Sequence, residues 1–316
     1  MKQSIKRAVE TVAAACPTTM AMPARWYLRN TPWHQGTRRL SVALDFNQRL
    51  RPHRFRTETR FGFEISGTTE DFVQRYIYVF GVWEPHLTYW IQDRLQPGDT
   101  FVDVGANIGY FTLLAAGCIR KQGWCVAIEA SPSIFELLKE NLELNHVGSR
   151  VRTVNLAASD RDGTLTVYGG PSGNLGLTTT VPNHDLRIET TIRAMPLKDI
   201  LTEGEIAAAR LIKIDVEGLE GPVVRGLLPI LGACREDLEI VLEVNGQATP
   251  EGERTSDIVR ELADLGFHTY EFVNNDEKDA YLKAIKAPQR PRRIDEDAEF
   301  DHETNLIFSR VDAPTI

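Results

Sequence analysis

The sequence predicts an α/β fold, in which helices cover both faces of a mostly parallel sheet. Short apolar runs alternate with helical patterns over residues 100–273, as strand–helix–strand units require. A glycine turn joins the first of these strands to the following helix. The 316 residues are 42% apolar and 25% charged, which is typical of a globular protein with a large core. These values exclude a disordered, collagenous or coiled-coil chain.

The net charge is acidic, because 36 Lys and Arg stand against 44 Asp and Glu, a difference of −8. An acidic protein has no general attraction for nucleic acid or anionic lipid, so we expect neither as a partner. No run approaches the roughly 20 apolar residues of a membrane-spanning helix. A small-molecule substrate is the expected partner, and the sequence leaves open whether the protein forms a homodimer.

The cysteines form no C-x-x-C pair, so we interpret them as free thiols in a reducing compartment and expect a cytoplasmic protein. They lie at positions 16, 118, 125 and 234. The basic N-terminus resembles a signal peptide, but Glu10 and two prolines interrupt its apolar stretch. We predict an amphipathic helix there, with Ile5, Val9 and Val12 on its apolar face.

Residues 1–85 are predicted to form an N-terminal extension of helices and short strands that acts as a lid or as a substrate or dimer element. Within it, Arg54–Ile65 alternates polar and apolar residues as a strand does, and Asp71–Phe80 has helical spacing. Pro85–Leu95 is a further helical segment. The main domain is predicted to span residues 86–316.

Strands and helices then alternate through the main domain. The predicted strands are Thr100–Val104, Val126–Glu129, Val151–Leu156, Leu211–Val216, Leu238–Val244 and Phe267–Val273. The predicted helices are Gly109–Ile119, one that begins at Ser131–Pro132, Pro222–Leu231 and Thr255–Leu265. Pro132 suits a first helical turn, where its missing N–H costs nothing, and Ser133 with Glu136 matches a capping box.

Two segments interrupt this alternation. Residues 160–196 contain a hairpin signal, Arg161–Thr164, followed by two strand-like runs, Leu165–Tyr168 and Thr190–Ala194. We predict an antiparallel excursion from the main sheet there. Residues 274–303 are rich in charge and proline, and we interpret them as a solvated loop in preference to a functional basic patch.

The segment Phe101–Phe111 runs from a buried strand through a glycine turn into a helix. Gly105 allows a tight turn and a close approach of a ligand to the backbone, and Gly109 allows the helix to pack closely on the strand. Asn107 stands where the dinucleotide fingerprint G-x-G-x-x-G has its second glycine, so that fingerprint is incomplete. The free N–H groups at the start of the helix favour a polar ligand.

Glu129 ends the next strand, 20 positions after Gly109, where a carboxylate in a nucleotide-binding fold accepts hydrogen bonds from ribose hydroxyls. The alternative for Glu129 is a cap on the helix that begins at Ser131. Asp103 lies inside an apolar strand, where an unpaired charge is costly. It is predicted to accept N–H groups of the turn or of a ligand, with a purely structural role as the alternative.

Four blocks of sequence together resemble the FkbM-type family of S-adenosylmethionine-dependent methyltransferases. They are FVDVGANIGYFTL (Phe101–Leu113), AIEASP (Ala127–Pro132), NLAASDRDG (Asn155–Gly163) and LIKIDVEGLEGPVVRG (Leu211–Gly226). Thr304–Ser309 is similar to the last strand of that family. The resemblance implies a Rossmann-like class I methyltransferase fold, with a seven-stranded sheet that has one antiparallel strand, and methyl transfer usually to a hydroxyl.

The resemblance also implies where S-adenosyl-L-methionine lies. Its methionine part would follow the glycine turn, its ribose would be held by Glu129, and its adenine would be bordered by residues after the third strand. The cofactor-binding residues implied in this way are Asp103, Gly105, Asn107, Gly109, Glu129, Ala130, Ser131, Ala157 and Ala158. Glu84 matches an acid that precedes the first strand in this family, but the resemblance gives it no role.

A methyl group on a sulfonium is already activated, so the protein has to align an acceptor, exclude water and assist removal of a proton. Acceptor sites in such sheets lie beyond the carboxyl ends of the strands. Asp215 and Glu217 follow one strand and Glu243 ends the next. We predict Asp215 as the base or orienting group with Glu243 in support. A structural role for Asp215, and a helix-start role for Glu217, are the alternatives.

Asp215, Glu243 and Asn245 form an oxygen-rich trio that resembles the magnesium site of catechol-type O-methyltransferases, although Val244 separates its last two members. We expect no metal and keep a divalent ion as the alternative. Asn174 and His184 are predicted to contact the acceptor from the excursion.

Trp83 is predicted to line the entrance of the cofactor site or to be a core aromatic side chain. His184 and His268 are also candidate bases, and His268 is more readily explained as a packed residue of a strand.

The predicted activity is O-methylation of a hydroxyl on a small molecule, such as a sugar, a glycan or a natural product, with S-adenosyl-L-homocysteine as the product. Transfer to nitrogen or to a carboxylate is the near alternative. A nicotinamide-dependent oxidoreductase would also use the turn and Glu129, and a non-catalytic cofactor-binding protein is a third class.

Overall fold

The computed structural model describes residues 21–30, 36–171, 173–182, 185–244, 254–272, 278–295, 298, 300 and 304–316. The predicted N-terminal helix at Ile5–Val12 lies outside these residues, as do His184 and Asn245. No helix in the described ranges is long and apolar enough to cross a membrane.

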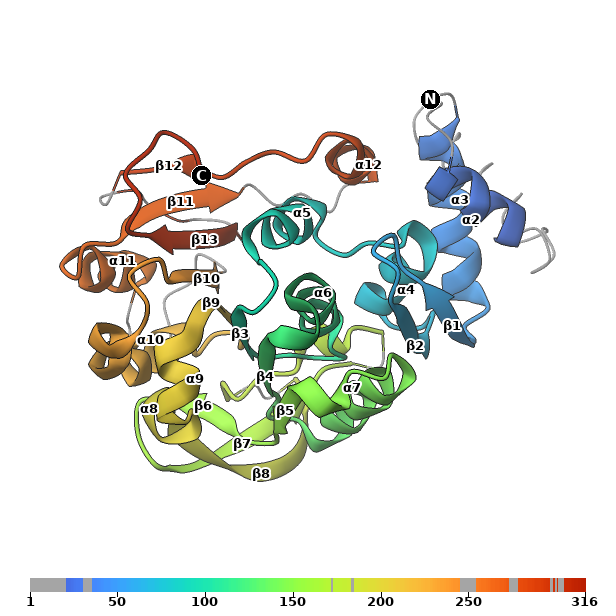
Figure 1. Ribbon diagram of the computed structural model, residues 1–316. Coiled ribbons are helices and arrows are strands. Elements are labelled where there is room, and N and C mark those ends of the chain that lie inside the picture. Colours follow the sequence, from blue (N-terminus) through green and yellow to red (C-terminus); the bar gives the residue numbers. More distant parts are fainter. Residues whose placement is uncertain are drawn as a thin grey trace.

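An eight-stranded sheet forms the centre of the molecule, in the order β12-β11-β13-β10-β9-β3-β4-β5 (Figure 1). Its strands are β3 (Thr100–Val104), β4 (Trp124–Ile128), β5 (Val151–Val154), β9 (Ala209–Ile214), β10 (Glu239–Val244), β11 (His268–Phe272), β12 (Arg292–Arg293) and β13 (Thr304–Ser309). β13 runs antiparallel to both of its neighbours, and the neighbouring pairs from β10 to β5 are parallel. The seven predicted strands are therefore present.

The eighth strand, β12, differs from the prediction of a single antiparallel strand. Its two residues pair antiparallel with β11, at Tyr270↔Arg293 and Glu271↔Arg292. This strand arises because the segment after α12 returns along the open edge of β11, where unpaired backbone groups are available for pairing.

Helices cover both faces of the sheet, because strand residues alternate between two cores. One core contains Phe101 and faces α5 (Pro85–Arg94), α6 (Tyr110–Ile119) and α7 (Pro132–Leu144). The other contains Val102 and faces four further helices. These are α8 (Leu197–Ile200), α9 (Glu203–Ala208), α10 (Glu220–Leu227) and α11 (Thr255–Ala263). Short 3-10 turns lie at η2 (Arg120–Gln122), η3 (Gly148–Arg150) and η5 (Leu228–Ala233).

Helix α7 begins as predicted at Pro132, but its cap differs from the expected box. The hydroxyl of Ser131 accepts a hydrogen bond from the backbone N–H of Ile134, which makes Ser131 the N-cap. Glu136 instead forms an ion pair with Lys139 on the helix surface. The predicted Ser133–Glu136 box is wrong by two positions because Ser131 already satisfies the first turn.

The N-terminal extension consists of α2 (Ala21–Asn30), α3 (Thr37–Leu50), β1 (Arg54–Glu58), β2 (Glu64–Thr68) and α4 (Phe72–Phe80). The prediction of one strand over residues 54–65 is wrong, since β1 and β2 form an antiparallel hairpin. The turn between them contains Gly62 at φ +82°, a conformation that favours glycine and reverses the chain.

Arg29 ties α2 to the end of α4. Its guanidinium donates to the backbone carbonyls of Ile77, Tyr78 and Val79, and to that of Glu58 on β1. The carbonyl of Ile77 also accepts from the N–H of Gly81, and that of Tyr78 accepts from Arg25, so the half-buried guanidinium of Arg29 adds to the capping of the last turn of α4. Burial and the neighbouring arginines lower the pKa of Arg29 to about 9.

The predicted antiparallel excursion is a three-stranded sheet of β6 (Ala157–Ser159), β7 (Gly163–Gly169) and β8 (Arg187–Pro196), in the order β6-β8-β7. β7 and β8 are antiparallel, with Leu165 opposite Ile192. The hairpin signal at Arg161–Thr164 does not form a hairpin, because β6 and β7 both pair with β8 and not with each other. A short 3-10 turn, η4 (Leu175–Leu177), lies between β7 and β8.

The expectation of a solvated loop over residues 274–303 is wrong for the described part of that segment. It contains α12 (Lys278–Lys286) and β12. Tyr281, Leu282 and Ile285 are buried on one face of α12, and the Tyr281 hydroxyl donates to the carbonyl of Val82. The charged residues hide this apolar stripe in a composition-based prediction.

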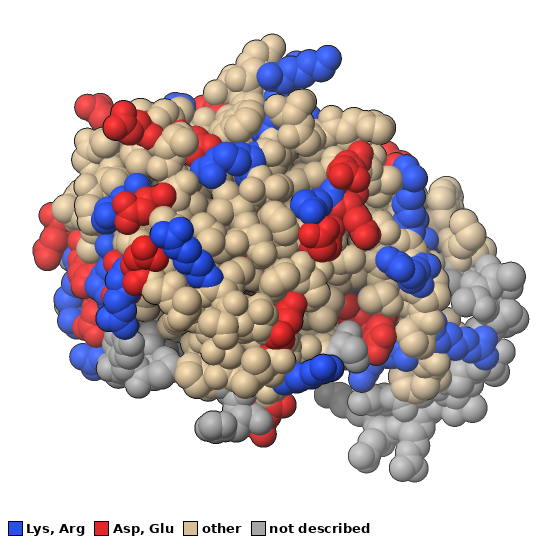
Figure 2. Space-filling view, turned by 90° about the horizontal axis from the view of Figure 1, so that it is seen from below, with Lys and Arg blue, Asp and Glu red and all other residues tan. Residues whose placement is uncertain are grey.

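Charged side chains of both signs are interspersed on the described surface that Figure 2 shows, with uncharged atoms over much of its middle. This pattern agrees with the acidic net charge and shows no broad basic face in that view.

Candidate functional site

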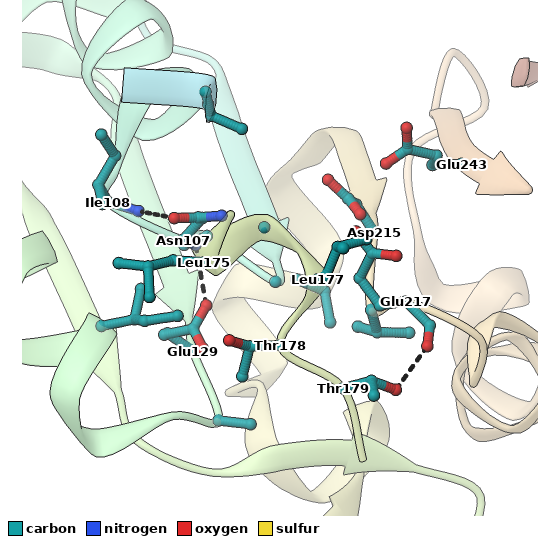
Figure 3. A pocket seen from close by; sticks show the side chains of 18 of the residues that line it. Asn107, Ile108, Glu129, Leu175, Leu177, Thr178, Thr179, Asp215, Glu217 and Glu243 are labelled. Atoms are coloured by element: carbon teal, nitrogen blue, oxygen red, sulfur yellow. Dashed lines mark hydrogen bonds between the residues drawn. The ribbon is translucent and has the colours of Figure 1, made fainter. Parts of the chain in front are cut away.

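A cavity of about 260 Å³ lies beyond the carboxyl ends of β3, β4, β9 and β10. Residues 173–180, which we call the strap, cover it from the excursion, and α4 and the segment before α5 complete its wall. Figure 3 shows Glu129 on one side of this pocket and Asp215, Glu217 and Glu243 on the other. In that view the strap residue Leu175 lies on the side of Glu129, and Leu177 lies between Glu129 and Asp215.

Gly105 makes the close approach of two chain segments possible. Its φ is +79°, and a Cβ placed on it would lie 1.7 Å from the carbonyl oxygen of Asp215. The N–H of Asp215 in turn donates to the carbonyl of Val104 at 3.0 Å. A residue with a side chain therefore cannot occupy position 105 without displacing the end of β9.

Asn107 and Glu129 are connected across this turn. The backbone N–H of Asn107 donates to Glu129 Oε2 at 2.8 Å, and the Asn107 side chain accepts from the N–H of Ile108 at 2.8 Å (Figure 3). Asn107 has φ +49°, a region in which Asn is one of the tolerated residues. The asparagine that breaks the dinucleotide fingerprint thus stabilises the turn.

Glu129 is held in place from both sides. Its second oxygen, Oε1, accepts from the N–H of Ser131 at 2.9 Å, and the Asn155 side chain donates to the carbonyl of Glu129 at 2.8 Å. The residue is 8% exposed, and burial raises its pKa to about 7. Each carboxylate oxygen keeps acceptor capacity beside its one N–H donor, so hydroxyl donors in the cavity fit this group.

Small and apolar side chains form the wall next to Glu129. This wall gives the cavity an apolar surface beside the Glu129 carboxyl group. Its members in the cavity lining are Ile128, Ala130, Ile134, Leu156, Ala157 and Ala158.

Lys213 and Asp215 form a buried ion pair on the opposite side. Lys213 lies on β9 and Asp215 directly follows the strand, and Lys213 Nζ lies 2.7 Å from Asp215 Oδ2. Lys213 also lies over the ring of Phe111, 5.0 Å from its centre. Burial opposes the charge on both groups, but the pKa of Asp215 is lowered and that of Lys213 raised because each stabilises the other.

Glu243 contributes a second carboxyl group beside Asp215. Burial and repulsion from Asp215 and Glu84 raise its pKa well above the ordinary value, and the two carboxyl groups share a hydrogen bond. A proton shared by the pair is therefore favoured on Glu243, and Lys213 stabilises the negative charge on Asp215.

Glu84 reaches the same region from the segment before α5. It is 8% exposed and lines the cavity at φ +37°. Asn305 on β13 donates to Glu84 Oε2 at 3.3 Å and stands opposite Glu243 in the β10–β13 ladder. Three carboxyl groups from distant parts of the sequence are thus brought together.

The strap is anchored to α4 and to the end of β9. Asp71 caps α4 by accepting from Gln74 N–H and, with its other oxygen, accepts from Leu175 N–H at 2.6 Å. On the far side, the Thr179 hydroxyl donates to the carbonyl of Glu217 at 2.6 Å (Figure 3). These bonds hold the strap over the pocket.

The family model for the methyltransferase FkbM domain matches residues 103–269 of this chain, which is more than half of its 316 residues. The chain belongs to the FkbM methyltransferase family. The matched segment is a methyltransferase domain with a Rossmann-like sheet, and this match favours methyl transfer over the nicotinamide-dependent alternative.

Three relatives of known name match parts of this FkbM-family chain. Methyltransferase 1 of Beauveria bassiana is 33% identical over 151 residues, which are 42% of this chain and 59% of that protein. The 31-O-demethyl-FK506 methyltransferase FkbM of Streptomyces tacrolimicus is 32% identical over 165 residues, 42% of this chain and 61% of that protein. The protein-L-isoaspartate O-methyltransferase of Caenorhabditis elegans is 28% identical over 141 residues, 43% and 58% of the two chains. The matches thus span about three fifths of these relatives.

Solved methyltransferase structures are also similar to this chain. An S-adenosylmethionine-dependent O-methyltransferase from Thermotoga maritima has a TM-score of 0.40 at 12% identity, with 82% of this chain and 78% of that chain covered. A precorrin-6y C5,15-methyltransferase from Geobacter metallireducens has a TM-score of 0.39 at 13% identity, with coverages of 71% and 86%.

Most of the site residues predicted for this methyltransferase lie together in the cavity lining. They are Gly105, Asn107, Glu129, Ala130, Ala157 and Ala158 for the cofactor, Asp215, Glu217 and Glu243 for catalysis, and Trp83 and Asn174 for the substrate. His184 lies outside the described residues, and His268 lies on β11 away from the cavity lining.

Three predicted cofactor residues do not line the cavity. Asp103 lies beneath it and accepts from the Thr112 hydroxyl at 2.6 Å, and burial raises its pKa to about 6. Gly109 is in contact with α7, since a Cβ there would lie 2.6 Å from Leu138 Cδ1. Ser131 caps α7, and its hydroxyl donates to Glu189 on β8 at 2.7 Å. These three residues therefore contact segments adjacent to the cavity and do not line it.

Glu217 lies in the lining at φ +54°, outside the helix that follows. The acid at the start of α10 is Glu220, whose side chain accepts from the N–H groups of Val216 and Gly218. The helix-start role considered for Glu217 therefore belongs to Glu220.

The sequence interpretation missed Lys213. The signal for it is a lysine within the apolar run Leu211–Ile214, placed two positions before an acid and therefore on the same face of the strand. In the parts of the chain that the structure describes, no group of three or more His, Cys, Asp or Glu side chains is arranged to hold a metal ion, and Asn245 of the predicted trio is outside them.

Proposed function

We propose that this methyltransferase transfers a methyl group to a hydroxyl of a small molecule, and that Asp215 accepts the proton of that hydroxyl. The observation that carries the proposal is the position of Asp215. It is a carboxylate kept ionised by Lys213 in the same cavity as the glycine turn and Glu129. A base of this kind contributes about 10²- to 10⁴-fold to rate.

The residues around the cavity fit S-adenosylmethionine. Ala157 and Ala158 would border the adenine, Glu129 would accept from the ribose hydroxyls, and the backbone at Gly105 and Asn107 would lie along the methionine part. The absence of a Cβ at position 105 keeps this turn open and close to β9. When bound, the cofactor supplies a methyl group on a positively charged sulfur, and the product is S-adenosylhomocysteine.

The chain's own groups prepare the acceptor. Lys213 keeps Asp215 charged and oriented, and Glu243 hydrogen-bonds to Asp215 beside it. The strap, anchored through Leu175 and Thr179, excludes water from the cavity. Its polar residues, with Asn174, and the indole of Trp83 would contact the acceptor.

A hydroxyl acceptor is favoured over an amine or a carboxylate. A neutral hydroxyl needs a base to remove its proton during transfer, and Asp215 supplies one. One relative, the 31-O-demethyl-FK506 methyltransferase, is named as an enzyme that acts on oxygen. A small neutral molecule such as a sugar, a glycan or a natural product fits this acceptor class.

Replacing Asp215 by Asn tests the proposal. The variant Asp215→Asn should bind S-adenosylhomocysteine within about threefold of the unmodified protein but lose about 10²- to 10⁴-fold in turnover, because only the base is removed. Calorimetry measures binding, and transfer of a labelled methyl group to panels of alcohols, amines and carboxylic acids measures turnover.

The matched control is Asp162→Asn, which removes an exposed carboxylate that pairs with Arg193 away from the cavity. This control should keep full turnover. Unchanged turnover in Asp215→Asn would refute the base assignment, and transfer to amines or acids but not to alcohols would refute the acceptor class.

A further inference from the structure

Charge is distributed unevenly along the chain. Residues 1–60 contain 12 Lys and Arg against 3 Asp and Glu, a net charge of +9. Residues 61–316 contain 24 against 41, a net charge of −17. The acidic net charge of the whole chain therefore conceals a basic N-terminal segment. An asymmetry of this kind indicates a local attraction for an anionic partner.

The helices of this segment form one end of the molecule. α2 and α3 pack against each other and against α4, and they lie on the far side of α4 from the central sheet (Figure 1). Their one acid is Asp45, which is buried and forms ion pairs with Arg75 and Lys278. The described residues of α2 and α3 therefore present no carboxylate to solvent.

Three arginines of this end have no acidic partner. Arg39 and Arg49 on α3 and Arg54 at the start of β1 are exposed. In the part of the chain that the structure describes, none of the three forms an ion pair, whereas Arg56 on β1 pairs with Glu64 at 2.5 Å. The positive charge of the three is thus available to an external anion.

Helix α3 also has the reverse of the usual amphipathic pattern. Val42, Phe46 and Leu50 follow one another at intervals of four residues and share one face, on which Val42 and Phe46 are half-buried and Leu50 is 52% exposed. A surface helix ordinarily turns its apolar side chains inward. The buried residues of α3 are instead mostly polar: Thr37, Ser41, Leu44, Asp45, Asn47 and Gln48.

Helix α2 adds two more exposed apolar side chains. Met22 and Trp26 are four residues apart, so they share a face, and they are 69% and 64% exposed. Together with Leu50, they are three of the seven large apolar side chains that are exposed in the described residues. A concentration of such side chains on two adjacent helices indicates an interaction surface.

The combination of free arginines with exposed apolar side chains distinguishes between partners. A nucleic acid backbone attracts arginine but offers no apolar phase for Met22 and Leu50. A second copy of this chain, docked through the same face, would bring like charges together. An anionic lipid surface satisfies both features, because its phosphates attract arginine and its acyl boundary accepts apolar side chains. Tryptophan is enriched at that boundary.

We propose that the outer side of α2 and α3 binds the surface of an anionic membrane. Its apolar side chains enter the boundary between headgroups and acyl chains, and its arginines contact lipid phosphates. We call this surface the basic apolar face, and it consists of Met22, Trp26, Arg39, Arg49, Leu50 and Arg54.

This placement brings the membrane close to the cavity. Helix α4 packs against α2 and α3, and its residues Phe72 and Val73 line the cavity. A membrane bound at the basic apolar face would thus lie next to the helix pair that packs on this wall of the site. The inference does not depend on the identity of the base or of the acceptor.

Sedimentation of the full chain with lipid vesicles measures this binding without methyl transfer. Vesicles of phosphatidylcholine with phosphatidylserine should bind the protein at least about 30-fold more tightly than vesicles of phosphatidylcholine alone. A basic residue near an anionic surface contributes about fivefold to binding, so the triple variant R39Q/R49Q/R54Q should bind about 100-fold more weakly. Its thermal unfolding should be close to that of the unmodified protein, since the three side chains are exposed.

The matched control is the triple variant R161Q/R187Q/R290Q, which removes three exposed arginines outside the segment and changes the net charge equally. Its binding to anionic vesicles should stay within about twofold of that of the unmodified protein. An equal loss in the two triple variants would overturn the assignment to the basic apolar face.

The apolar part of the face has its own variant, M22S/W26S. This variant should bind anionic vesicles about tenfold more weakly and keep the salt dependence of the unmodified protein, because its arginines remain. Unchanged binding in this variant would overturn the insertion of these side chains.

Measurements on the unmodified protein keep the test decisive if a variant fails to fold. Raising the salt concentration from about 0.05 M to about 0.5 M should weaken vesicle binding at least about tenfold, since salt screens the attraction. Equal affinity for the two kinds of vesicle would overturn the proposal. Tighter binding to an RNA or DNA oligonucleotide than to anionic vesicles would assign the face to nucleic acid, and a dimer in solution that M22S/W26S abolishes would assign it to a second copy. Either result would overturn the membrane assignment.

Discussion

At the scale of single residues, Gly105 is required for two reasons: its φ is positive, and its Cα lies against the carbonyl of Asp215. The positive φ of this residue is shared with Gly62, at +79° and +82° respectively, but only Gly105 is in close contact with another segment. Its hypothetical Cβ overlaps the Asp215 carbonyl, whereas the Cβ of a residue at position 62 would meet nothing within 4 Å. Substitutions at the two glycines therefore distinguish the free energy cost of a positive φ from the cost of a clash with the Asp215 carbonyl.

We predict that Gly105→Ala lowers the free energy of unfolding by more than about 3 kcal/mol and abolishes cofactor binding, because the end of β9 has to move. Gly62→Ala, the matched control, should cost only about 1 kcal/mol and leave binding intact. Urea denaturation and calorimetry measure both effects. Similar losses of stability in the two variants would show that the close approach to Asp215 does not affect the free energy of unfolding.

Glu129 gives a prediction of pH dependence. Its pKa is raised to about 7 in the folded protein, above its ordinary value of 4.5, so the folded state prefers the protonated form. Ionisation of this group therefore costs stability progressively as the pH rises from about 4.5 to 7, and the cost is absent at lower pH. Donation from two ribose hydroxyls would favour the ionised form and offset that cost in the complex.

The affinity for S-adenosylhomocysteine should accordingly rise between pH 6 and pH 8, and Glu129→Gln should bind about 10- to 100-fold more weakly at pH 8 with a flatter profile. The variant should also gain stability relative to the unmodified protein as the pH increases over the same range. Calorimetry and thermal unfolding at several pH values measure these effects. A profile in Glu129→Gln as steep as in the unmodified protein would assign the pH dependence to another group.

At the scale of elements, the strap depends on a single carboxylate that serves two segments. Asp71 caps α4 with one oxygen and holds the N–H of Leu175 with the other. Asn in its place keeps an acceptor for the cap, since Asn is as good an N-cap as Asp, but its amide nitrogen cannot accept from Leu175. The substitution therefore removes the hydrogen bond to the strap and keeps the N-cap of α4.

In Asp71→Asn, the amide of Leu175 should exchange with solvent about 10- to 100-fold faster, while the melting temperature changes by only a few degrees. Hydrogen exchange with mass spectrometry resolves the strap from the rest of the chain. The neighbouring exposed acid provides the control variant Glu70→Gln, which should leave exchange unchanged. Unchanged protection of Leu175 in Asp71→Asn would mean that the strap is held by its other contacts.

The elements differ in how well the sequence predicts them. The strands from Thr100 to Phe272 follow from buried apolar runs, because both faces of a parallel sheet are covered and the signal is local. The β1–β2 hairpin and α12 were missed, because a short turn and a charged surface obscured their patterns. The glycine turn with Asn107 follows from one contiguous motif, Phe101–Phe111.

The side of the pocket that contains Glu84, Asp215 and Glu243 could not be predicted as a unit. Glu84, Lys213 and Asn305 come from three separate segments, and no local pattern indicates that a tertiary contact joins them. The strap contacts at Asp71 and Thr179 are of the same kind, since each connects segments that are far apart in sequence. A single sequence carries no direct record of such pairings.

At the scale of the whole molecule, the N-terminal extension shares its core with the main domain. Leu44 and Ile77 belong to the same buried cluster as Phe101 and Leu114. The cavity lining also takes residues from both sides of the boundary predicted at residues 85 and 86. We therefore expect the two parts to unfold together.

A chain that starts at residue 86 should show no cooperative thermal transition and no binding of S-adenosylhomocysteine, whereas the full chain shows a single transition. Burial of each large aliphatic side chain contributes about 1.5 to 3 kcal/mol, and a domain is stable by only about 5 to 15 kcal/mol. Losing several such contacts is therefore enough to unfold the remainder. Scanning calorimetry tests this, and a shortened chain that melts cooperatively would establish an independent domain.

The bond between Asn305 and Glu84 connects positions 221 residues apart. During synthesis, a ribosome-bound chain will have exposed Glu84 and the glycine turn long before β13 emerges from the exit tunnel. The nascent protein thus has the glycine turn of its pocket first and the Asn305 contact to Glu84 last. Full affinity for the methyl donor should appear only when translation has passed the final strand, so ligand capture by stalled chains of increasing length would record the moment at which the fold closes.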